Sequence, residues 1–189
     1  MIIRIKFAII NRINSVKTIL VNFFILKVLK QPHYLNTPNA NLFVNFIFQR
    51  IFGINRDIPF SVSFTSRYQG FKNIKLPKNS DSIKLSMAVS GGCYFSVFDG
   101  SLLEIGENSL WASNVCIQTG NHDLMNRNQY STASIKIGEN CWIGNSVTIL
   151  KGVELGDNVT VAANSVVTKS FPSNVVIAGV PAKIIKYID

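Results

Sequence analysis

The sequence predicts an all-β protein, a parallel β-helix of six-residue repeats that follows an N-terminal α-helical or irregular segment. Two observations carry this prediction: a repeat of period six that begins at Ile105, and a sharp change in charge after residue 56. Only 15% of the 189 residues are charged and 47% are hydrophobic. That composition excludes a disordered chain, which combines low hydrophobicity with high net charge.

The formal net charge of +9 is concentrated in one segment. Residues 1–56 hold eight basic side chains and no acidic one, and the first carboxylate is Asp57. The remaining chain balances 11 basic against 10 acidic groups. We therefore divide the sequence into a basic amphipathic segment, residues 1–56, and a repeat domain, residues 57–189.

An apolar stripe at helical spacing begins the chain and predicts an amphipathic helix. Its members are Ile2, Ile5, Ile9, Ile13, Val16, Leu20 and Phe23. The helix either packs against its own assembly, as a cap over the end of the β-helix, or lies on a membrane surface. The absence of acidic residues favours peripheral membrane contact through residues 1–30. A nucleic-acid partner is not expected, because the charges flank an apolar face.

Cysteine and histidine counts indicate the compartment. The three cysteines form no CxxC pair and the chain has only two histidines, so neither a disulfide framework nor a metal site is expected. No secretory signal is recognisable and no apolar run is long enough to span a bilayer. These features predict a cytoplasmic protein.

The repeat consists of nine hexads whose first position is aliphatic in eight cases and Trp in one. These first positions are Ile105, Trp111, Ile117, Ile137, Ile143, Ile149, Leu155, Val161 and Val167. A helix requires a period of 3.6 and a simple strand a period of two. A period of six is explained by a short strand and a turn, repeated so that three faces close one coil and each face buries one large residue.

The repeat is interrupted between Ile117 and Ile137, and the segment at residues 123–134 is too polar to form a coil face. We expect it to leave the coil as a loop. Loops that project from rigid scaffolds often carry function. His122, in the string TGNH, stands at the start of this loop.

The strings IGENCW, IGNSVT and GVPAK at this spacing resemble the hexapeptide-repeat acyltransferases, and in particular their galactoside/maltose O-acetyltransferase branch. The resemblance is sharpest over residues 90–187, and we interpret residues 57–104 as looser early coils. It implies a left-handed parallel β-helix assembled as a homotrimer. It also implies that acetyl-CoA is the acyl donor.

The same resemblance implies roles for the residues beside the loop. His122 takes the place of the general base, and an imidazole suits that task because its pKa lies near neutrality. Asp99 takes the place of a carboxylate that binds the sugar acceptor. Asp123 acts either on the substrate or as a turn-forming residue.

The acyl-CoA site that the resemblance implies has seven members. They are Trp142, Asn145, Ala163, Thr168, Lys169, Lys183 and Lys186. The two C-terminal lysines take the places of basic residues that face the CoA phosphates. Cys93 and Cys141 are expected to be small core residues, not nucleophiles.

Together these features predict an acetyl-CoA-dependent O-acetyltransferase that acts on a sugar hydroxyl of a surface-polysaccharide precursor. Two alternatives remain open at this stage: N-acetylation of an amino-sugar nucleotide, and a non-catalytic β-helix scaffold. A zinc hydratase on the same fold would need three histidine ligands, which this chain lacks.

Overall fold

A computed structural model describes residues 18–30, 34 and 40–188. The chain divides into two compact units, Met1–Ala40 and Asn41–Asp189. Residues 41–56, which the charge pattern groups with the N-terminal segment, thus share a unit with the repeat domain. Among the residues described, no helix is long and apolar enough to cross a membrane.

The first unit is helical where it is described. Residues 18–23 form α-helix and continue into a π-helical turn, η1 (Phe24–Leu29), which ends at Lys30 in the left-handed conformation. The predicted apolar stripe from Ile2 to Val16 lies outside the described residues. Its last two members, Leu20 and Phe23, lie on the described helix and are exposed.

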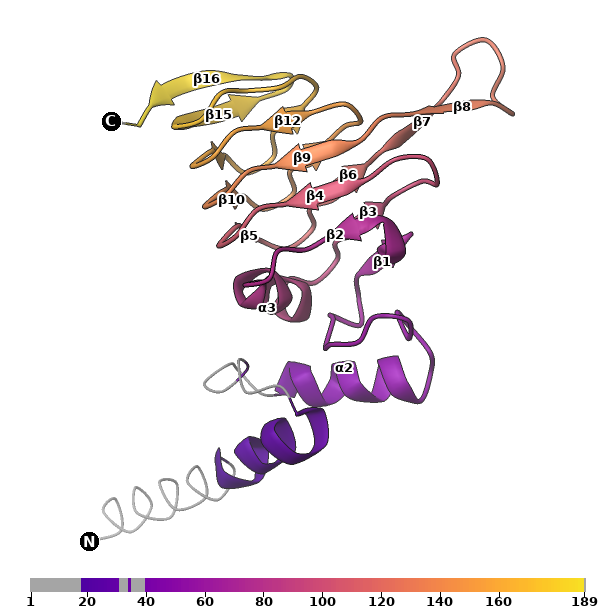
Figure 1. Cartoon of the computed structure of the whole chain (residues 1–189), viewed down its shortest axis with the longest axis vertical. Helices are drawn as coiled ribbons and strands as arrows, with labels where there is room; N and C mark the ends of the chain where they lie inside the picture. Colours follow the sequence, from indigo (N-terminus) through magenta and orange to yellow (C-terminus); the bar gives the residue numbers. More distant parts are fainter. Residues whose placement is uncertain (1–17, 31–33, 35–39, 189) are drawn as a thin grey trace, which may run out of the picture. The chain divides into compact units, whose positions relative to one another are not determined.

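The second unit is built from three sheets that surround one apolar core, and their strands pair in parallel except for the antiparallel pair β15/β16 (Figure 1). The first sheet has the order β1-β3-β6-β11-β14. The second has the order β12-β9-β4-β2, and the third β16-β15-β13-β10-β5. From β4 onward the chain visits the second, third and first sheets in turn, so three strands make one coil. The parallel pairing agrees with the coil that the period of six predicts.

The elements of the second unit are short, as a six-residue repeat requires. The helices are α2 (Ala40–Arg50), η3 (Phe71–Asn73) and α3 (Asp81–Val89). The strands are β1 (Arg67–Gln69), β2 (Ile74–Lys75), β3 (Tyr94–Ser96), β4 (Leu103–Ile105), β5 (Leu110–Trp111), β6 (Cys116–Gln118), β7 (Gly120–His122), β8 (Tyr130–Thr132), β9 (Ile135–Ile137), β10 (Trp142–Ile143), β11 (Thr148–Ile149), β12 (Glu154–Leu155), β13 (Thr160–Val161), β14 (Val166–Val167), β15 (Val175–Gly179) and β16 (Ala182–Tyr187).

All nine first hexad positions are buried, including Trp111. Each lies directly above its counterpart in the next coil; for example, Ile143 pairs in register with Trp111 on one side and Val161 on the other. At the corner between the second and third sheets, the backbone is left-handed at Asn108, Asn140, Asn158 and Asn174. Asparagine tolerates this conformation better than other residues with a side chain, which explains its recurrence in the repeat.

The first coil departs from the repeat because helix α3 occupies the place of a third-sheet strand. Strands β1, β2 and β3 pair within the first and second sheets, as early coils should. Helix α3 then lies against β5, the edge strand of the third sheet. Ser86 accepts a hydrogen bond from the Trp111 N–H (3.3 Å), and Ser90 donates one to the Trp111 carbonyl (2.8 Å). The helix thereby satisfies backbone groups that an open edge would leave unpaired.

Candidate active site

His122 ends β7, which pairs with β8 as an antiparallel hairpin that projects from the coil (Figure 1). The side chain is exposed, and its Nδ1 lies 2.7 Å from the Arg127 carbonyl oxygen across the loop. A carbonyl oxygen only accepts hydrogen bonds, so Nδ1 carries the hydrogen. In the neutral ring Nε2 is then the unprotonated nitrogen, and it can accept a proton.

Asp123 organises the loop that follows. Its Oδ1 accepts hydrogen bonds from the backbone N–H groups of Met125 (2.8 Å) and Asn126 (2.9 Å). These two donors hold the pKa of the Asp123 carboxyl below its usual value, with the Asn126 bond the stronger cause. Of the two roles considered for this residue, the geometry supports the turn-forming one.

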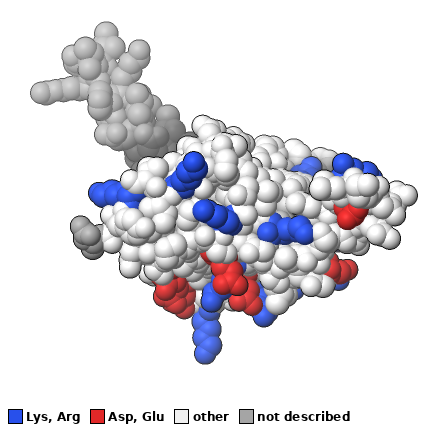
Figure 2. Space-filling model, turned by 90° about the horizontal axis from the view of Figure 1, so that it is seen from above, with Lys and Arg blue, Asp and Glu red and all other residues white. Residues whose placement is uncertain are grey.

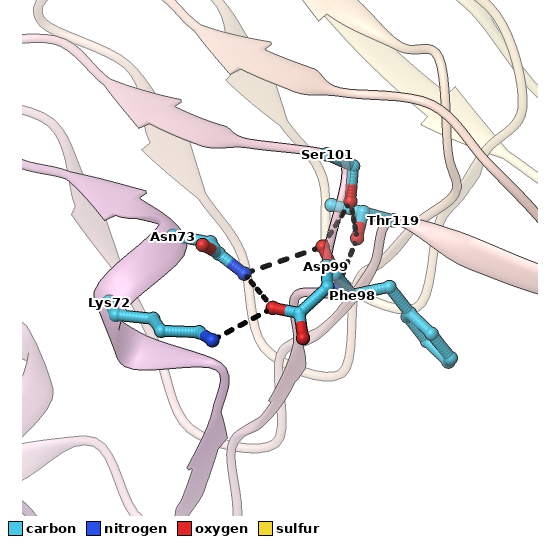
Figure 3. A network of polar contacts seen from close by, with 6 residues as sticks. All are labelled: Lys72, Asn73, Phe98, Asp99, Ser101 and Thr119. Atoms are coloured by element: carbon cyan, nitrogen blue, oxygen red, sulfur yellow. Dashed lines mark hydrogen bonds and ion pairs between the residues drawn. The ribbon is translucent and has the colours of Figure 1, made fainter.

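Asp99 lies in an exposed polar network (Figure 3). Its Oδ1 accepts a hydrogen bond from the Asn73 amide at 3.1 Å and forms an ion pair with Lys72 at 3.1 Å. The Asn73 bond, and then Lys72, lower the pKa of this carboxyl. Asp99 is therefore ionised at neutral pH and able to accept hydrogen bonds from hydroxyl groups.

Thr119 lies between β6 and β7, just before His122, and is fully buried. It connects this segment to the loop that contains Asp99. Its Oγ1 accepts a hydrogen bond from the Phe98 N–H (2.9 Å) and another from the Ser101 hydroxyl (2.7 Å), as Figure 3 shows. The Phe98 ring also packs against Tyr130, with ring centroids 5.2 Å apart. Tyr130 pairs in register with His122. The structure thus brings the Asp99 loop and the His122 hairpin to one corner, between the first and second sheets.

Three of the predicted donor-site residues lie on or beside the third sheet. Trp142 is exposed on β10, and Asn145 and Ala163 stand at the corner between the third and first sheets. The Asn145 side chain donates to the Ser113 carbonyl at 2.9 Å, which links neighbouring coils. Within the part of the chain that the structure describes, the N–H groups of Asn145 and Ala163 donate to no protein acceptor. They are available to a ligand oxygen.

The other four donor-site residues are exposed and separate into two pairs. Thr168 and Lys169 follow β14 at the corner that also holds His122, and the Lys169 ammonium lies 5.7 Å from the centroid of the Phe171 ring. Lys183 and Lys186 lie on β16, in the third sheet. Figure 2 views the molecule from above and shows separated Lys and Arg side chains with no continuous basic patch. Most of the Asp and Glu in view gather along one margin.

A single chain therefore presents the predicted site residues in two groups on either side of the first sheet. One group contains His122, Asp99, Asp123, Thr168 and Lys169. The other belongs to the third sheet and its corner: Trp142, Asn145, Ala163, Lys183 and Lys186.

The three cysteines are free thiols, and burial raises the pKa of each. A thiol with a raised pKa is a poor nucleophile at neutral pH. Among the described residues, no group of three or more His, Cys, Asp or Glu side chains is placed to hold a metal ion.

Four contributors to the site have no signal in the repeat pattern. They are Lys72, Asn73, Thr119 and the carbonyl of Arg127. Lys72 and Asn73 stand more than twenty residues before Asp99, and the Arg127 carbonyl reaches His122 only because the loop closes as a hairpin. Thr119 belongs to the TGNH string, but its burial and its hydrogen bonds appear only in the structure.

Comparison with known proteins identifies the repeat. Residues 134–169 match the family described as bacterial transferase hexapeptide (six repeats). The repeat is of the hexapeptide-transferase type. The chain is 42% identical over 98 residues to a galactoside O-acetyltransferase of Escherichia coli K12, a match that covers 50% of this chain and 48% of the relative. It is 41% identical over 95 residues to the putative lipopolysaccharide biosynthesis O-acetyl transferase WbbJ of the same organism, covering 43% and 48%.

These matches confirm the resemblance to the hexapeptide-repeat acyltransferases, and they span about half the length of these curated relatives. A likeness of fold extends further. A crystal structure of AntD, an N-acyltransferase from Bacillus cereus, matches 68% of this chain and 81% of its own, with a TM-score of 0.52 and 18% identity. At that identity the likeness concerns the fold alone.

Proposed function

We propose that this protein is an O-acetyltransferase that moves the acetyl group of acetyl-CoA to a hydroxyl of a sugar, with His122 as the general base. The acceptor is a precursor of a surface polysaccharide. The hydrogen bond between His122 Nδ1 and the Arg127 carbonyl carries the proposal, because it leaves Nε2 as the proton acceptor. The names of the E. coli relatives support the reaction class.

In the proposed reaction, His122 Nε2 removes the proton of the acceptor hydroxyl as its oxygen attacks the thioester carbonyl carbon. A tetrahedral oxyanion forms, and the free N–H groups of Asn145 and Ala163 are suited to stabilise it. The C–S bond then breaks, and the imidazolium returns the proton to the departing CoA thiolate. The products are the acetylated sugar and free CoA. Asp99 accepts hydrogen bonds from other hydroxyls of the acceptor.

Acetyl-CoA extends along the coil in this proposal. Trp142 packs beside the pantetheine arm, Thr168 and Lys169 contact the cofactor, and Lys183 and Lys186 face its phosphates. Lysine provides point charges there and lacks the paired donors of arginine.

We further propose a homotrimer of left-handed parallel β-helices. The two groups of site residues support this assembly, because the His122 corner of one chain can face the Trp142 sheet of the next. The trimer is cytoplasmic, where acetyl-CoA and free thiols are found. Residues 1–30 make peripheral contact with the membrane, which suits an acceptor on a lipid carrier.

Acetyl-CoA-dependent thiol release, measured with a panel of hydroxyl and amine acceptors, tests the proposed reaction. We expect release that depends on a sugar hydroxyl, with an ester in the product. If thiol release is accelerated only by an amino-sugar nucleotide and the product contains an amide, the protein is an N-acetyltransferase and the proposed function is wrong. No release with any acceptor would instead support a non-catalytic scaffold.

A further inference from the structure

Helix α2 has its polar side inward. The stripe that it buries contains Leu42, Asn45 and Gln49, and the two amide residues are only 1% and 3% exposed. A helix at the surface of a protein ordinarily buries its apolar face and exposes its polar one. Helix α2 departs from this rule at Asn45 and Gln49, which are buried, and at Phe43, which is exposed.

The buried amides explain the inversion. The Gln49 amide donates to the carbonyls of Ile58 (2.8 Å) and Phe60 (2.9 Å). The Asn45 amide donates to the Ala88 carbonyl (2.9 Å) and accepts from the Phe64 N–H (3.0 Å). These are backbone groups of the irregular segment before β1 and of the end of α3, and they need partners once buried. The polar side of α2 supplies them.

The opposite side of the helix is apolar and reaches solvent at its C-terminal end. Ile51 continues the helix through a hydrogen bond from its N–H to the Ile47 carbonyl (2.9 Å) and is 70% exposed. Phe52 is 67% exposed, although its ring packs on Phe48. Exposed Arg50 and Arg56 stand on either side of this pair in the sequence. We call Arg50, Ile51, Phe52 and Arg56 the α2 patch.

We propose that the α2 patch inserts into the surface of a membrane that contains anionic lipids. Adjacent exposed apolar side chains with basic neighbours fit the boundary between acyl chains and anionic headgroups. Within this unit, residues 41–56 hold two basic groups, Arg50 and Arg56, and no acidic one, because the first acidic residue of the chain is Asp57.

The same charges argue against contact between the α2 patches of two copies of the chain. Two α2 patches in contact would bring Arg50 and Arg56 of each copy close to those of the other, and the patch holds no carboxylate to pair with them. The helix at residues 18–29, in the other unit, shows the same chemistry, with exposed Ile19, Leu20 and Phe23 beside Lys27. The α2 patch lies outside residues 1–30 and its role does not depend on acetyl transfer.

Flotation of the full-length protein with vesicles tests the proposal. The vesicles contain phosphatidylcholine alone or a mixture with phosphatidylglycerol. We expect binding to the anionic vesicles, and an apparent partition coefficient about tenfold lower for the double variant Ile51→Ser/Phe52→Ser, which loses its apolar anchors. The variant Arg50→Gln/Arg56→Gln should bind more weakly, and added salt should weaken wild-type binding more than that of this variant.

Ile185→Ser is the matched control, because Ile185 is an exposed isoleucine on β16 of the same unit. Equal partitioning of this control and of the Ile51→Ser/Phe52→Ser variant would overturn the proposal, as would equal binding of the wild type to neutral and anionic vesicles. Sedimentation without lipid detects the competing outcome. If the double variant lowers the oligomeric state, the patch is a contact between copies and the membrane proposal is wrong. Unchanged far-ultraviolet circular dichroism shows that the variants are folded.

Discussion

At the scale of single residues, the proposed chemistry depends on which nitrogen of His122 carries a proton. The sequence places a histidine at the root of the loop, and the carbonyl of Arg127 then selects the tautomer. No residue-type pattern encodes that contact, because the acceptor is a backbone atom. The place of the histidine in the loop was therefore predictable from the sequence. Which of its ring nitrogens carries the hydrogen could be inferred only from the folded hairpin.

Thr119 carries the first prediction. Thr119→Val removes a buried hydroxyl and leaves the Phe98 N–H without its acceptor, so we expect the free energy of unfolding to fall by about 1–3 kcal/mol. Urea denaturation measures the change. Thr160→Val is the matched control, because Thr160 is half-buried on the outer side of β13. Equal stability of the two variants would show that the Thr119 hydroxyl does not hold the Asp99 loop.

At the scale of elements, the β7/β8 hairpin positions the base, and Asp123 shapes its loop. The pKa of Asp123 is lowered in the folded protein, so its contribution to stability is present above the ordinary aspartate pKa of about 3.9. That contribution is lost as the pH falls through the lower, folded-state pKa.

We therefore predict that the side-chain carboxyl carbon shift of Asp123, followed by NMR, shows a titration midpoint below that of an ordinary aspartate. At neutral pH, Asp123→Ala should shift the amide protons of Met125 and Asn126, whereas Asp57→Ala, a change of an exposed carboxylate outside the hairpin, should not. A titration midpoint of the Asp123 carboxyl at or above the ordinary aspartate value would contradict the assignment of these hydrogen bonds.

The spacing between coils gives a further prediction. A Cβ at Gly138 would lie 2.5 Å from the Gly156 carbonyl oxygen of the next coil, too close for any stable contact. Gly138→Ala should lower the free energy of unfolding by about 1–3 kcal/mol, because the two neighbouring coils must move apart to admit the methyl group.

The alanine at the equivalent position of a later hexad provides the control for this prediction. Ala162→Gly relieves no contact and should cost only about 0.5–1 kcal/mol, through the added freedom of the unfolded chain. Thermal or urea unfolding compares the two variants. A Gly138→Ala protein as stable as the wild type would mean that the coils are not packed as closely as described.

Where the period of six is regular, the sequence predicted the elements well, because each hexad buries one large residue and the signal repeats. Where contacts with distant segments decide the local structure, the sequence did not predict the element. Helix α3 stands in place of an early strand because it pairs the edge groups of Trp111, and α2 buries Asn45 and Gln49 because distant carbonyls require donors. Both sets of hydrogen bonds join segments that are far apart in the chain, so the local periodicity of the sequence cannot predict them.

At the scale of the whole molecule, the two groups of site residues lead to a prediction about assembly. Analytical ultracentrifugation should find a particle with about three times the 21.0 kDa mass of one chain. A single-chain particle with full transferase activity would contradict the proposed trimer, since one chain holds His122 and Trp142 on separate sheets.

The central claim, that His122 is the base of an acetyl transfer, is tested most directly by the rate of acetyl-CoA-dependent thiol release in His122→Ala. The account predicts a fall in kcat of about a hundredfold to ten-thousandfold with CoA binding retained, since the variant loses only the proton acceptor. Asn128→Ala, an exposed change in the same loop, should keep the wild-type rate. Equal turnover by His122→Ala and the wild type would contradict the account.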